Sequence, residues 1–124
     1  MEEKILILIK ANEDSSKDAI KTVIQKGYKV DARDFFVNSL TQNELAELIN
    51  KTDLPIADCV RTVDKMYKKI FGEEDLTQYD RNLLFENLVK YPRLINRPIV
   101  IAGSRACIGR PISKLEAFLD EIKK

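Results

Sequence analysis

The sequence Leu94-Ile95-Asn96-Arg97-Pro98-Ile99-Val100-Ile101 places a proline at the start of a short β-branched run, with an arginine directly before it. Because proline cannot donate a hydrogen bond within a sheet, it belongs at the first residue of a strand or on an edge strand. We therefore expect Pro98 to have a structural role at the start of a strand. Backbone geometry would then position Arg97, which is the first residue that we expect to meet an anion.

Other strands are predicted on both sides of this stretch. Residues 98–101 and 105–108 form two short runs joined through Gly103-Ser104, a pattern typical of a β-hairpin. Near the N-terminus, residues 5–9 are a continuous apolar run that is typical of a strand buried on both faces. Residues 28–36 are predicted to form a further strand.

Helical patterns lie between these strands. Apolar residues at helical spacing precede Gly27, which would end the first helix. Thr41 and Glu44 form a capping box that predicts a helix over residues 42–51. Helical patterns continue over residues 55–70 and 75–91, and a second capping box at Ser113 and Glu116 predicts a final helix.

The element order β-α-β, several helices, then β-β-α predicts an α/β fold. It is the order of a thioredoxin-like, or glutaredoxin-like, four-stranded mixed sheet. We expect residues 1–124 to form a single domain, with a core of residues 1–40 and 92–124. Residues 41–91 would be a helical insertion.

Composition excludes several classes of protein. The 124 residues contain 21 Lys and Arg and 20 Asp and Glu, so the net charge of +1 offers no argument for direct nucleic-acid or membrane binding. The apolar run near the N-terminus is too short for a signal peptide, so we expect a cytoplasmic location. The chain has no histidine, and Cys59 and Cys107 lie far apart. We therefore expect no metal site and no histidine-activated nucleophile.

The phrase from Tyr91 to Val100, together with Gly109-Arg110-Pro111, resembles the signature of arsenate reductases that work with glutathione and glutaredoxin. Their relatives are the Spx-type transcriptional regulators, and the resemblance covers nearly the whole chain. It implies thiol-dependent reduction of arsenate, with no bound cofactor and with glutathione as a co-substrate. It also implies a protein partner, either glutaredoxin or, for an Spx-like protein, RNA polymerase.

In that family, three arginines surround a reactive cysteine and an oxyanion, and their counterparts here are Arg61, Arg97 and Arg110. Guanidinium groups bind tetrahedral oxyanions through paired, charge-assisted hydrogen bonds. The same positive field lowers the pKa of a nearby thiol. The resemblance places the cysteine in the loop before the first helix, where free backbone N–H groups add to that field.

This chain departs from the family at the cysteine itself. Counting back from Gly27 without gaps places Glu13 at the position of the nucleophile, and a one-residue gap would bring Asn12 or Asp14 there instead. A carboxylate cannot form a mixed disulfide, and its charge at a helix N-terminus opposes oxyanion binding. We therefore predict a degenerate or inactive arsenate reductase-like protein that still binds a small oxyanion or glutathione.

Three alternatives remain open from the sequence. The arginines could pair with Glu13, Asp14 or Asp18 and serve only to hold the fold together. Cys107 could be a relocated nucleophile near Arg110, although a free cysteine in a strand usually acts as a small apolar residue. The chain could also be a non-enzymatic, Spx-like adaptor that binds RNA polymerase or another protein.

Overall fold

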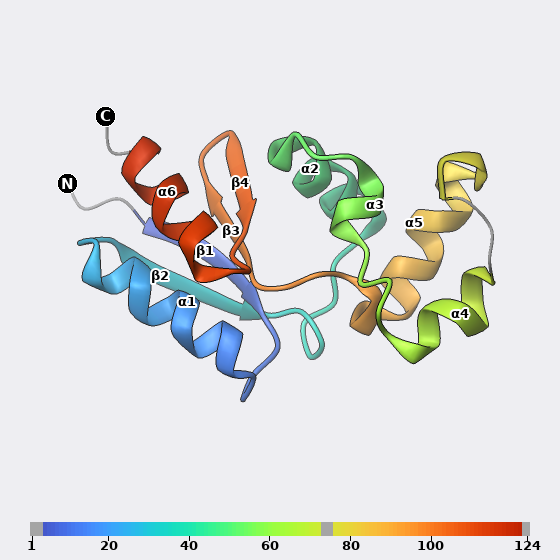
Figure 1. Ribbon diagram of the computed structural model, residues 1–124, viewed down its shortest axis with the longest axis horizontal. Helices are drawn as coiled ribbons and strands as arrows, with labels where there is room; N and C mark the ends of the chain where they lie inside the picture. Colours follow the sequence, from blue (N-terminus) through green and yellow to red (C-terminus); the bar gives the residue numbers. More distant parts are fainter. Residues whose placement is uncertain (1–3, 73–75, 123–124) are drawn as a thin grey trace.

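The computed structural model describes residues 4–72 and 76–122 and is shown in Figure 1. Its strands are β1 (Lys4–Ile9), β2 (Lys29–Asp34), β3 (Ile99–Ala102) and β4 (Arg105–Ile108). Its α-helices are α1 (Asp14–Gln25), α2 (Gln42–Thr52), α3 (Ile56–Cys59), α4 (Lys65–Phe71), α5 (Arg81–Lys90) and α6 (Ile112–Ile122). Two short 3₁₀ helices, η1 (Leu76–Gln78) and η2 (Pro92–Leu94), flank α5.

The strands form one mixed sheet in the order β2-β1-β3-β4, which confirms the predicted α/β fold with four strands. Strand β1 runs parallel to β2 and antiparallel to β3, and β3 and β4 form the predicted antiparallel hairpin. In the register, Ile7 lies beside Ala32 on one side and Val100 on the other. The peptide bonds before Pro98 and Pro111 are both cis.

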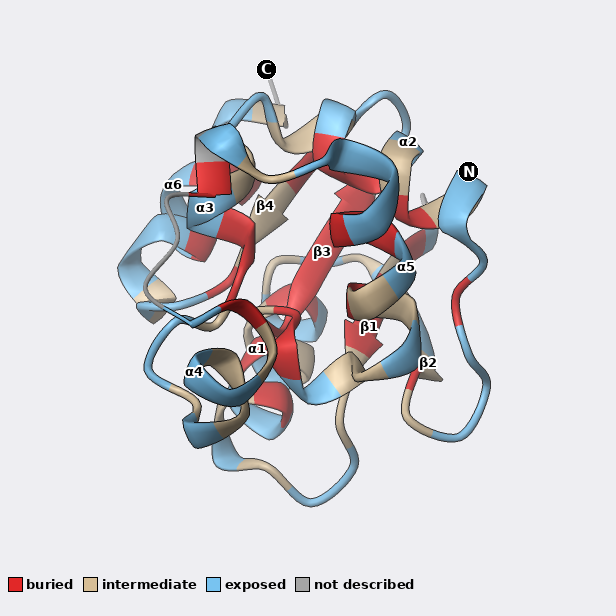
Figure 2. Cartoon of the chain, turned by 90° about the vertical axis from the view of Figure 1, so that its right-hand side faces the viewer, coloured by how far each residue is buried: buried red, intermediate tan, exposed pale blue. Residues whose placement is uncertain are grey.

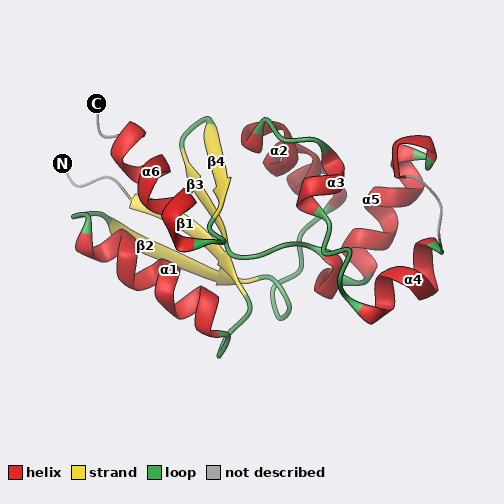
Figure 3. Cartoon of the chain, viewed as in Figure 1, coloured by secondary structure: helices red, strands yellow, loops and turns green. Residues whose placement is uncertain are grey.

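Helices cover the sheet unequally, as Figures 1 and 3 show. Helices α1 and α6 pack together on one face over a core that includes Ile7, Val100 and Leu119, each of which is fully buried. A second apolar cluster starts from Leu8 and Ile101 on the sheet and continues through α2 into α5. Figure 2 shows this buried material along β1 and β3 and on the inner faces of the helices. The two clusters place the sheet between its helical layers.

Local sequence signals explain the start and end of α2. The hydroxyl of Thr41 accepts a hydrogen bond from the Glu44 N–H, and the Glu44 carboxylate accepts one from the Thr41 N–H, so the predicted capping box is present. Such reciprocal bonds satisfy backbone donors that a helix leaves free at its N-terminus. Asp53 ends the helix in the left-handed conformation, with φ of 56°.

The predicted helical pattern over residues 55–70 is wrong as a single element. Helix α3 ends at Cys59, and Val60 then adopts extended backbone and pairs with Ile95 in an antiparallel bridge. Helix α4 starts only after Asp64, whose carboxylate accepts a hydrogen bond from the Met66 N–H. A long-range bridge and a new cap have therefore overridden the local periodicity.

Two other helix predictions need correction. The prediction for residues 75–91 begins at Asp75, which lies outside the described residues, and α5 itself starts only at Arg81, after the cap residue Asp80. Leu83 is an apolar residue of that predicted helical pattern, yet it is 46% exposed. Helix α6 begins at Ile112, so Ser113 lies inside its first turn and cannot be its N-cap.

No helix within residues 4–72 and 76–122 has both the length and the apolar character needed to cross a bilayer.

Candidate functional site

Glu13 stands at the point where the chain leaves β1 and enters α1. Its backbone is extended, and it is the N-cap residue of the helix, yet its side chain makes no capping hydrogen bond. The carboxylate instead accepts hydrogen bonds from Arg97, which arrives from the segment before β3, 84 residues further along the chain. The side chain that replaces the expected thiol therefore turns away from the helix backbone and toward an arginine.

Arg97 binds the Glu13 carboxylate in a bidentate ion pair. Nε donates to Oε1 at 2.8 Å and Nη2 donates to Oε2 at 2.8 Å. Nη1 donates to the backbone carbonyls of Arg93 at 2.9 Å and Ile95 at 3.3 Å. Because a guanidinium has five N–H donors, these four bonds leave one of them for any other ligand. Only 4% of the Arg97 side chain is exposed, so the pair lies largely out of water.

An aromatic ring completes the surroundings of Arg97. The Arg97 guanidinium lies 5.1 Å from the ring centre of Phe36, and Lys10 Nζ lies 5.4 Å from the same ring. A cation over an aromatic face is attracted to the negative charge of the ring. The loop after β2 therefore supplies a further contact to Arg97.

The hydrogen bonds from Arg97 hold the pKa of Glu13 below its ordinary value of 4.5. Burial acts in the opposite direction, while the charges of Arg97, Lys10 and Arg61 add to the lowering. Glu13 is therefore ionised in the folded protein at neutral pH and supplies a permanent negative charge where the family resemblance places a thiolate.

We expect Glu13 to make the free energy of unfolding depend on acidity. Its folded-state pKa lies below the unfolded value of 4.5, so its contribution is present above that pH and is lost as the pH falls through the lower value. Urea unfolding between about pH 5 and about pH 3 should therefore show a steeper loss for the wild type than for Glu13→Gln. Parallel curves for the two proteins would contradict this account of the ion pair.

Arg61 is held by a different carboxylate. Its Nη1 lies 3.8 Å from Asp64 Oδ2, and Arg93 binds the same carboxylate more closely, at 3.0 Å from Oδ1. Burial opposes ionisation of Asp64, but the Met66 N–H and the Arg93 guanidinium outweigh it and hold the pKa of Asp64 below its ordinary value. The Nε atom of Arg61 is buried and has no hydrogen-bond partner among the described residues. Arg61 therefore keeps donor capacity that its own partner does not use.

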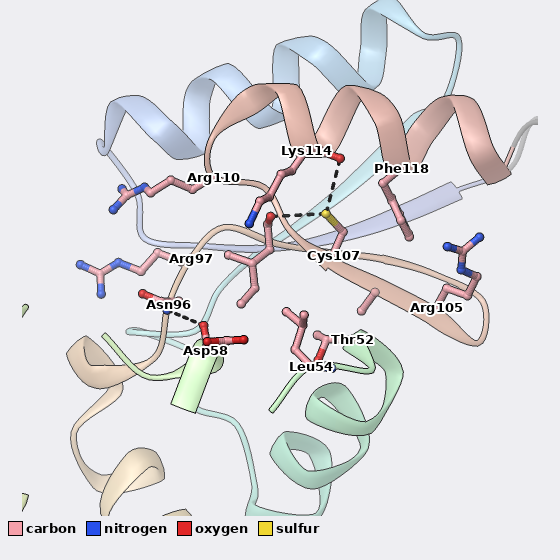
Figure 4. A pocket seen from close by; sticks show the side chains of 12 residues that line it. Thr52, Leu54, Asp58, Asn96, Arg97, Arg105, Cys107, Arg110, Lys114 and Phe118 are labelled. Atoms are coloured by element: carbon pink, nitrogen blue, oxygen red, sulfur yellow. Dashed lines mark hydrogen bonds between the residues drawn. The ribbon is translucent and has the colours of Figure 1, made fainter. Parts of the chain in front are cut away.

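The side chain of Arg110, which precedes α6, reaches the first turn of α1. Its Nη2 donates a hydrogen bond of 2.8 Å to the hydroxyl of Ser15, and its side chain is exposed. Figure 4 shows Arg110 and Arg97 extending in the same direction, toward the N-terminal end of α1. Arg97 and Arg110 therefore line one groove at that end of the helix, and the positive charge of Arg61 makes a smaller contribution to lowering the pKa of Glu13.

Of the three acidic residues that could have paired with the arginines, only one does so in the structure. Glu13 pairs with Arg97. Asp14 is the first residue of α1, and both Asp14 and Asp18 are exposed; within the described ranges neither bonds to any of the three arginines. The pairing that the sequence left open is therefore made at Glu13.

Neither cysteine has the surroundings of an activated thiol. Burial raises the pKa of Cys107, although Lys114 and Arg105 act against that rise. Burial also raises the pKa of Cys59, which is only 3% exposed. Because the thiolate is the reactive form, a raised pKa reduces reactivity at neutral pH. Among the described residues, no group of three or more acidic or sulfur ligands is placed to hold a metal ion.

Sequence reasoning missed Phe36, Asp64 and Arg93 as parts of this site. Asp64 was readable as the cap of α4, but its contact with Arg93 joins residues 29 positions apart. Phe36 is the last residue of the strand predicted over residues 28–36, and in the structure it follows β2 and contacts Arg97. Only the folded arrangement shows these contacts.

The sheet order and the arginines around the start of α1 define a thioredoxin-like domain with a cationic site at a helix N-terminus. The chain belongs to the ArsC family, whose family model matches residues 9–118.

Individual relatives agree with this assignment. The chain is 29% identical over 105 residues to an arsenate reductase from Neisseria meningitidis serogroup A, covering 84% of this chain and 88% of that protein. It is 28% identical over 80 residues to the global transcriptional regulator Spx 1 of Lactococcus lactis, covering 64% of this chain and 61% of that protein. The structure of an arsenate reductase from Vibrio cholerae has the same fold, with a TM-score of 0.85 and 23% identity, covering 94% of this chain and 98% of that one.

Proposed function

We propose that this protein is an anion-binding member of the ArsC family that has exchanged thiol chemistry for an internal carboxylate. Its ligand would be a small oxyanion or glutathione, and it would not reduce arsenate. The two-pronged Glu13–Arg97 pair, with both contacts at 2.8 Å, is the observation that carries the proposal.

The remaining cationic groups support binding without catalysis. Arg97 has one N–H donor left, whereas Arg61 keeps a buried, unpartnered Nε and Arg110 is engaged only by a hydroxyl among the described residues. An anion at the start of α1 would therefore use Arg61, Arg110 and the last donor of Arg97. Its affinity would be reduced by repulsion from Glu13, because like charges at this distance oppose each other.

The absence of a suitable thiol argues against arsenate reduction. A carboxylate at Glu13 has no sulfur with which to bind arsenic as a thiolate does or to form a mixed disulfide with glutathione, so it provides no route for the two electrons that arsenate reduction requires. Cys107 of β4 does not replace the missing thiol. Burial raises its pKa, and its thiol makes only weak contacts with the backbone carbonyls of Ile108 and Lys114.

Thermal unfolding with arsenate, sulfate or glutathione tests the proposal. At a ligand concentration about ten times Kd, binding should raise Tm by about 5 °C. Arg110→Ala should abolish most of the rise, because it removes one of the guanidinium groups that would bind the anion. The variant should still fold, because the Arg110 side chain is exposed and can be removed without opening the core. Arg81→Ala, which removes an arginine that lies over Phe85 on α5, is the matched control and should leave the rise intact.

Two results would refute this function. No change in Tm with any of the three ligands would exclude the anion site. Glutathione-dependent arsenate turnover by the purified wild type would exclude the loss of catalysis, and loss of that turnover in Cys107→Ser would identify a moved nucleophile.

The similarity to Spx regulators keeps a second candidate function open, that of a non-enzymatic adaptor for RNA polymerase or another protein. A protein surface can persist after the thiol has been lost, which suits the carboxylate at Glu13. Co-purification of polymerase with the tagged chain from its native cytosol, together with no ligand-induced change in Tm, would favour the adaptor over the anion-binding protein.

A further inference from the structure

A groove of about 580 Å³ runs along the outer edge of β4 and reaches Asn96 and Arg97 at one end. Four consecutive residues, Arg105–Ile108, line it. Because successive side chains of a strand point to opposite faces of the sheet, a cavity that touches all four must follow the strand edge. Strand β4 is the last strand of the sheet, so no other strand of the described residues pairs with that edge.

The hairpin register shows which backbone groups face the groove. The Gly109 N–H donates to the Pro98 carbonyl at 2.8 Å, so this is a hydrogen-bonded position of the antiparallel pair. Hydrogen-bonded and non-hydrogen-bonded positions alternate along such a ladder. Cys107 and Arg105 therefore bond inward to β3, whereas Ala106 and Ile108 direct their N–H and C=O groups outward.

These outward groups are largely unused. No backbone hydrogen bond joins the Ala106 or Ile108 N–H to a described residue outside the sheet. The Ile108 carbonyl accepts a contact of 3.3 Å from the Cys107 thiol, which is a weak donor. An unpaired strand edge of this kind is a template for another strand.

The walls of the groove leave room beside the edge (Figure 4). On one side stand Lys114 and Phe118 of α6, and on the other stand Thr52, Leu54 and Asp58 from the end of α2 to α3. Apolar atoms from Ile108, Leu54 and Phe118 would contact the side chains of an inserted segment. The cleft is therefore shaped for an extended chain between two helical layers.

The charged residues that line the groove indicate which kind of peptide it would bind. Arg110 and Lys114 stand at one end of the groove and Arg105 at the other (Figure 4), and Asp58 is the one acid among the described lining residues. Arg105 is paired with Glu121 at 3.2 Å, but both side chains are about half exposed or more, so water weakens that pair. Among the described residues, Lys114 has no carboxylate partner. The groove therefore favours an acidic ligand.

We infer that the β4 edge binds an acidic, extended peptide segment of another protein, which adds to the sheet as a fifth strand. Main-chain hydrogen bonds to Ala106 and Ile108 give affinity, and Arg105, Lys114 and Arg110 select acidic side chains. A second copy of this chain does not fit the same edge, because pairing two β4 strands would bring two sets of these cations together.

A five-residue peptide of alternating glutamate and valine, blocked at both ends, is the probe. At about ten times Kd it should slow hydrogen exchange at the Ala106 and Ile108 amides by about tenfold, as measured by NMR. The matched lysine–valine peptide should not bind. A glutamate–valine peptide methylated on alternate backbone nitrogens should lose binding, because it cannot donate to the strand edge.

Charge-reversed variants test the selection without touching the anion site. Arg105→Glu with Lys114→Glu should weaken binding by about tenfold or more. Lys68→Glu with Lys69→Glu makes the same change in net charge on exposed positions of α4, outside the groove, and should leave affinity within about twofold of the wild type.

Several outcomes would overturn the strand-addition proposal. These are no binding of the acidic peptide, binding without protection of either amide, equal binding of the N-methylated peptide, and equal weakening in the α4 variant. Arg97 and Arg110 belong to both the groove and the proposed anion site, but the variants change neither of them. Loss of peptide binding with the ligand-induced rise in Tm intact would therefore overturn strand addition alone, and the reverse result would overturn the anion site alone.

Discussion

Glu13→Gln should lower the free energy of unfolding by about 2–3 kcal/mol at neutral pH, a large effect for one isosteric change. The substitution keeps the size of the side chain but removes the charge that neutralises Arg97. That guanidinium is 4% exposed, so it would be left as an uncompensated buried cation. We set the cost below the range of about 3–5 kcal/mol for fully buried pairs because 22% of the Glu13 side chain remains exposed.

Glu44→Gln provides the matched control. Glu44 also pairs with an arginine through both oxygens, at 2.7 Å and 3.3 Å from the Arg33 guanidinium, but its side chain is 42% exposed. Glutamine can also retain the Glu44 role in the α2 capping box. Urea unfolding should therefore show a loss of less than about 1 kcal/mol for this variant. Similar losses in the two variants would show that Arg97 does not depend on Glu13.

The Glu13→Gln variant should also gain affinity for anions. With Glu13 neutral, sulfate or arsenate can take the place of the carboxylate in the Arg97 fork, and added salt of this kind should restore much of the lost stability. Chloride at equal ionic strength separates this specific effect from general screening. Equal rescue by chloride would show that no fork-shaped site has been opened.

Glu13→Cys should convert the protein from one without arsenate reductase activity into one with measurable, glutathione-dependent turnover. The new thiol would lie at the N-terminus of α1, beside Arg97 and within the fields of Arg61 and Arg110. These positive groups should lower its pKa below about 7, which can be followed by the absorbance of the thiolate during a pH titration. The arginines freed from Glu13 would then face the incoming oxyanion.

Two variants make the gain of function specific. Glu13→Ser removes the same carboxylate but supplies no sulfur, so it should bind anions without turnover. Glu13→Cys combined with Arg110→Ala should have a lower rate while remaining folded, because Arg110 is exposed. An ordinary thiol pKa and no turnover in Glu13→Cys would mean that the site has lost more than its nucleophile.

Much of the core was predictable because its signals are local. The apolar run before Ile9, the capping box at Thr41 and the turn at Gly103 each act through residues within one element or one turn. Each of these elements was found close to its predicted place. Such signals survive in a single sequence because backbone hydrogen bonding and side-chain periodicity depend on near neighbours.

The helical insertion was less predictable. Val60 continues an apolar helical pattern, yet it leaves the helix to pair with Ile95, 35 positions away. Leu83 fits the inward stripe of α5 and is nevertheless 46% exposed. For Val60 the competing interaction lies in another part of the chain, and local periodicity carries no information about it.

The sequence was sufficient to assign the ArsC family and the mixed sheet and to identify Arg61, Arg97 and Arg110 as candidate anion-binding residues, because these depend on motifs and on short-range periodicity. It also showed that no cysteine lies in the loop before α1. Whether Glu13 repels an anion, or takes its place in the fork of Arg97, depended on contacts between residues 84 positions apart. The open edge of β4 likewise became visible only after strand order, register and the two helical layers were known, since pairing across a sheet is a property of distant segments brought together.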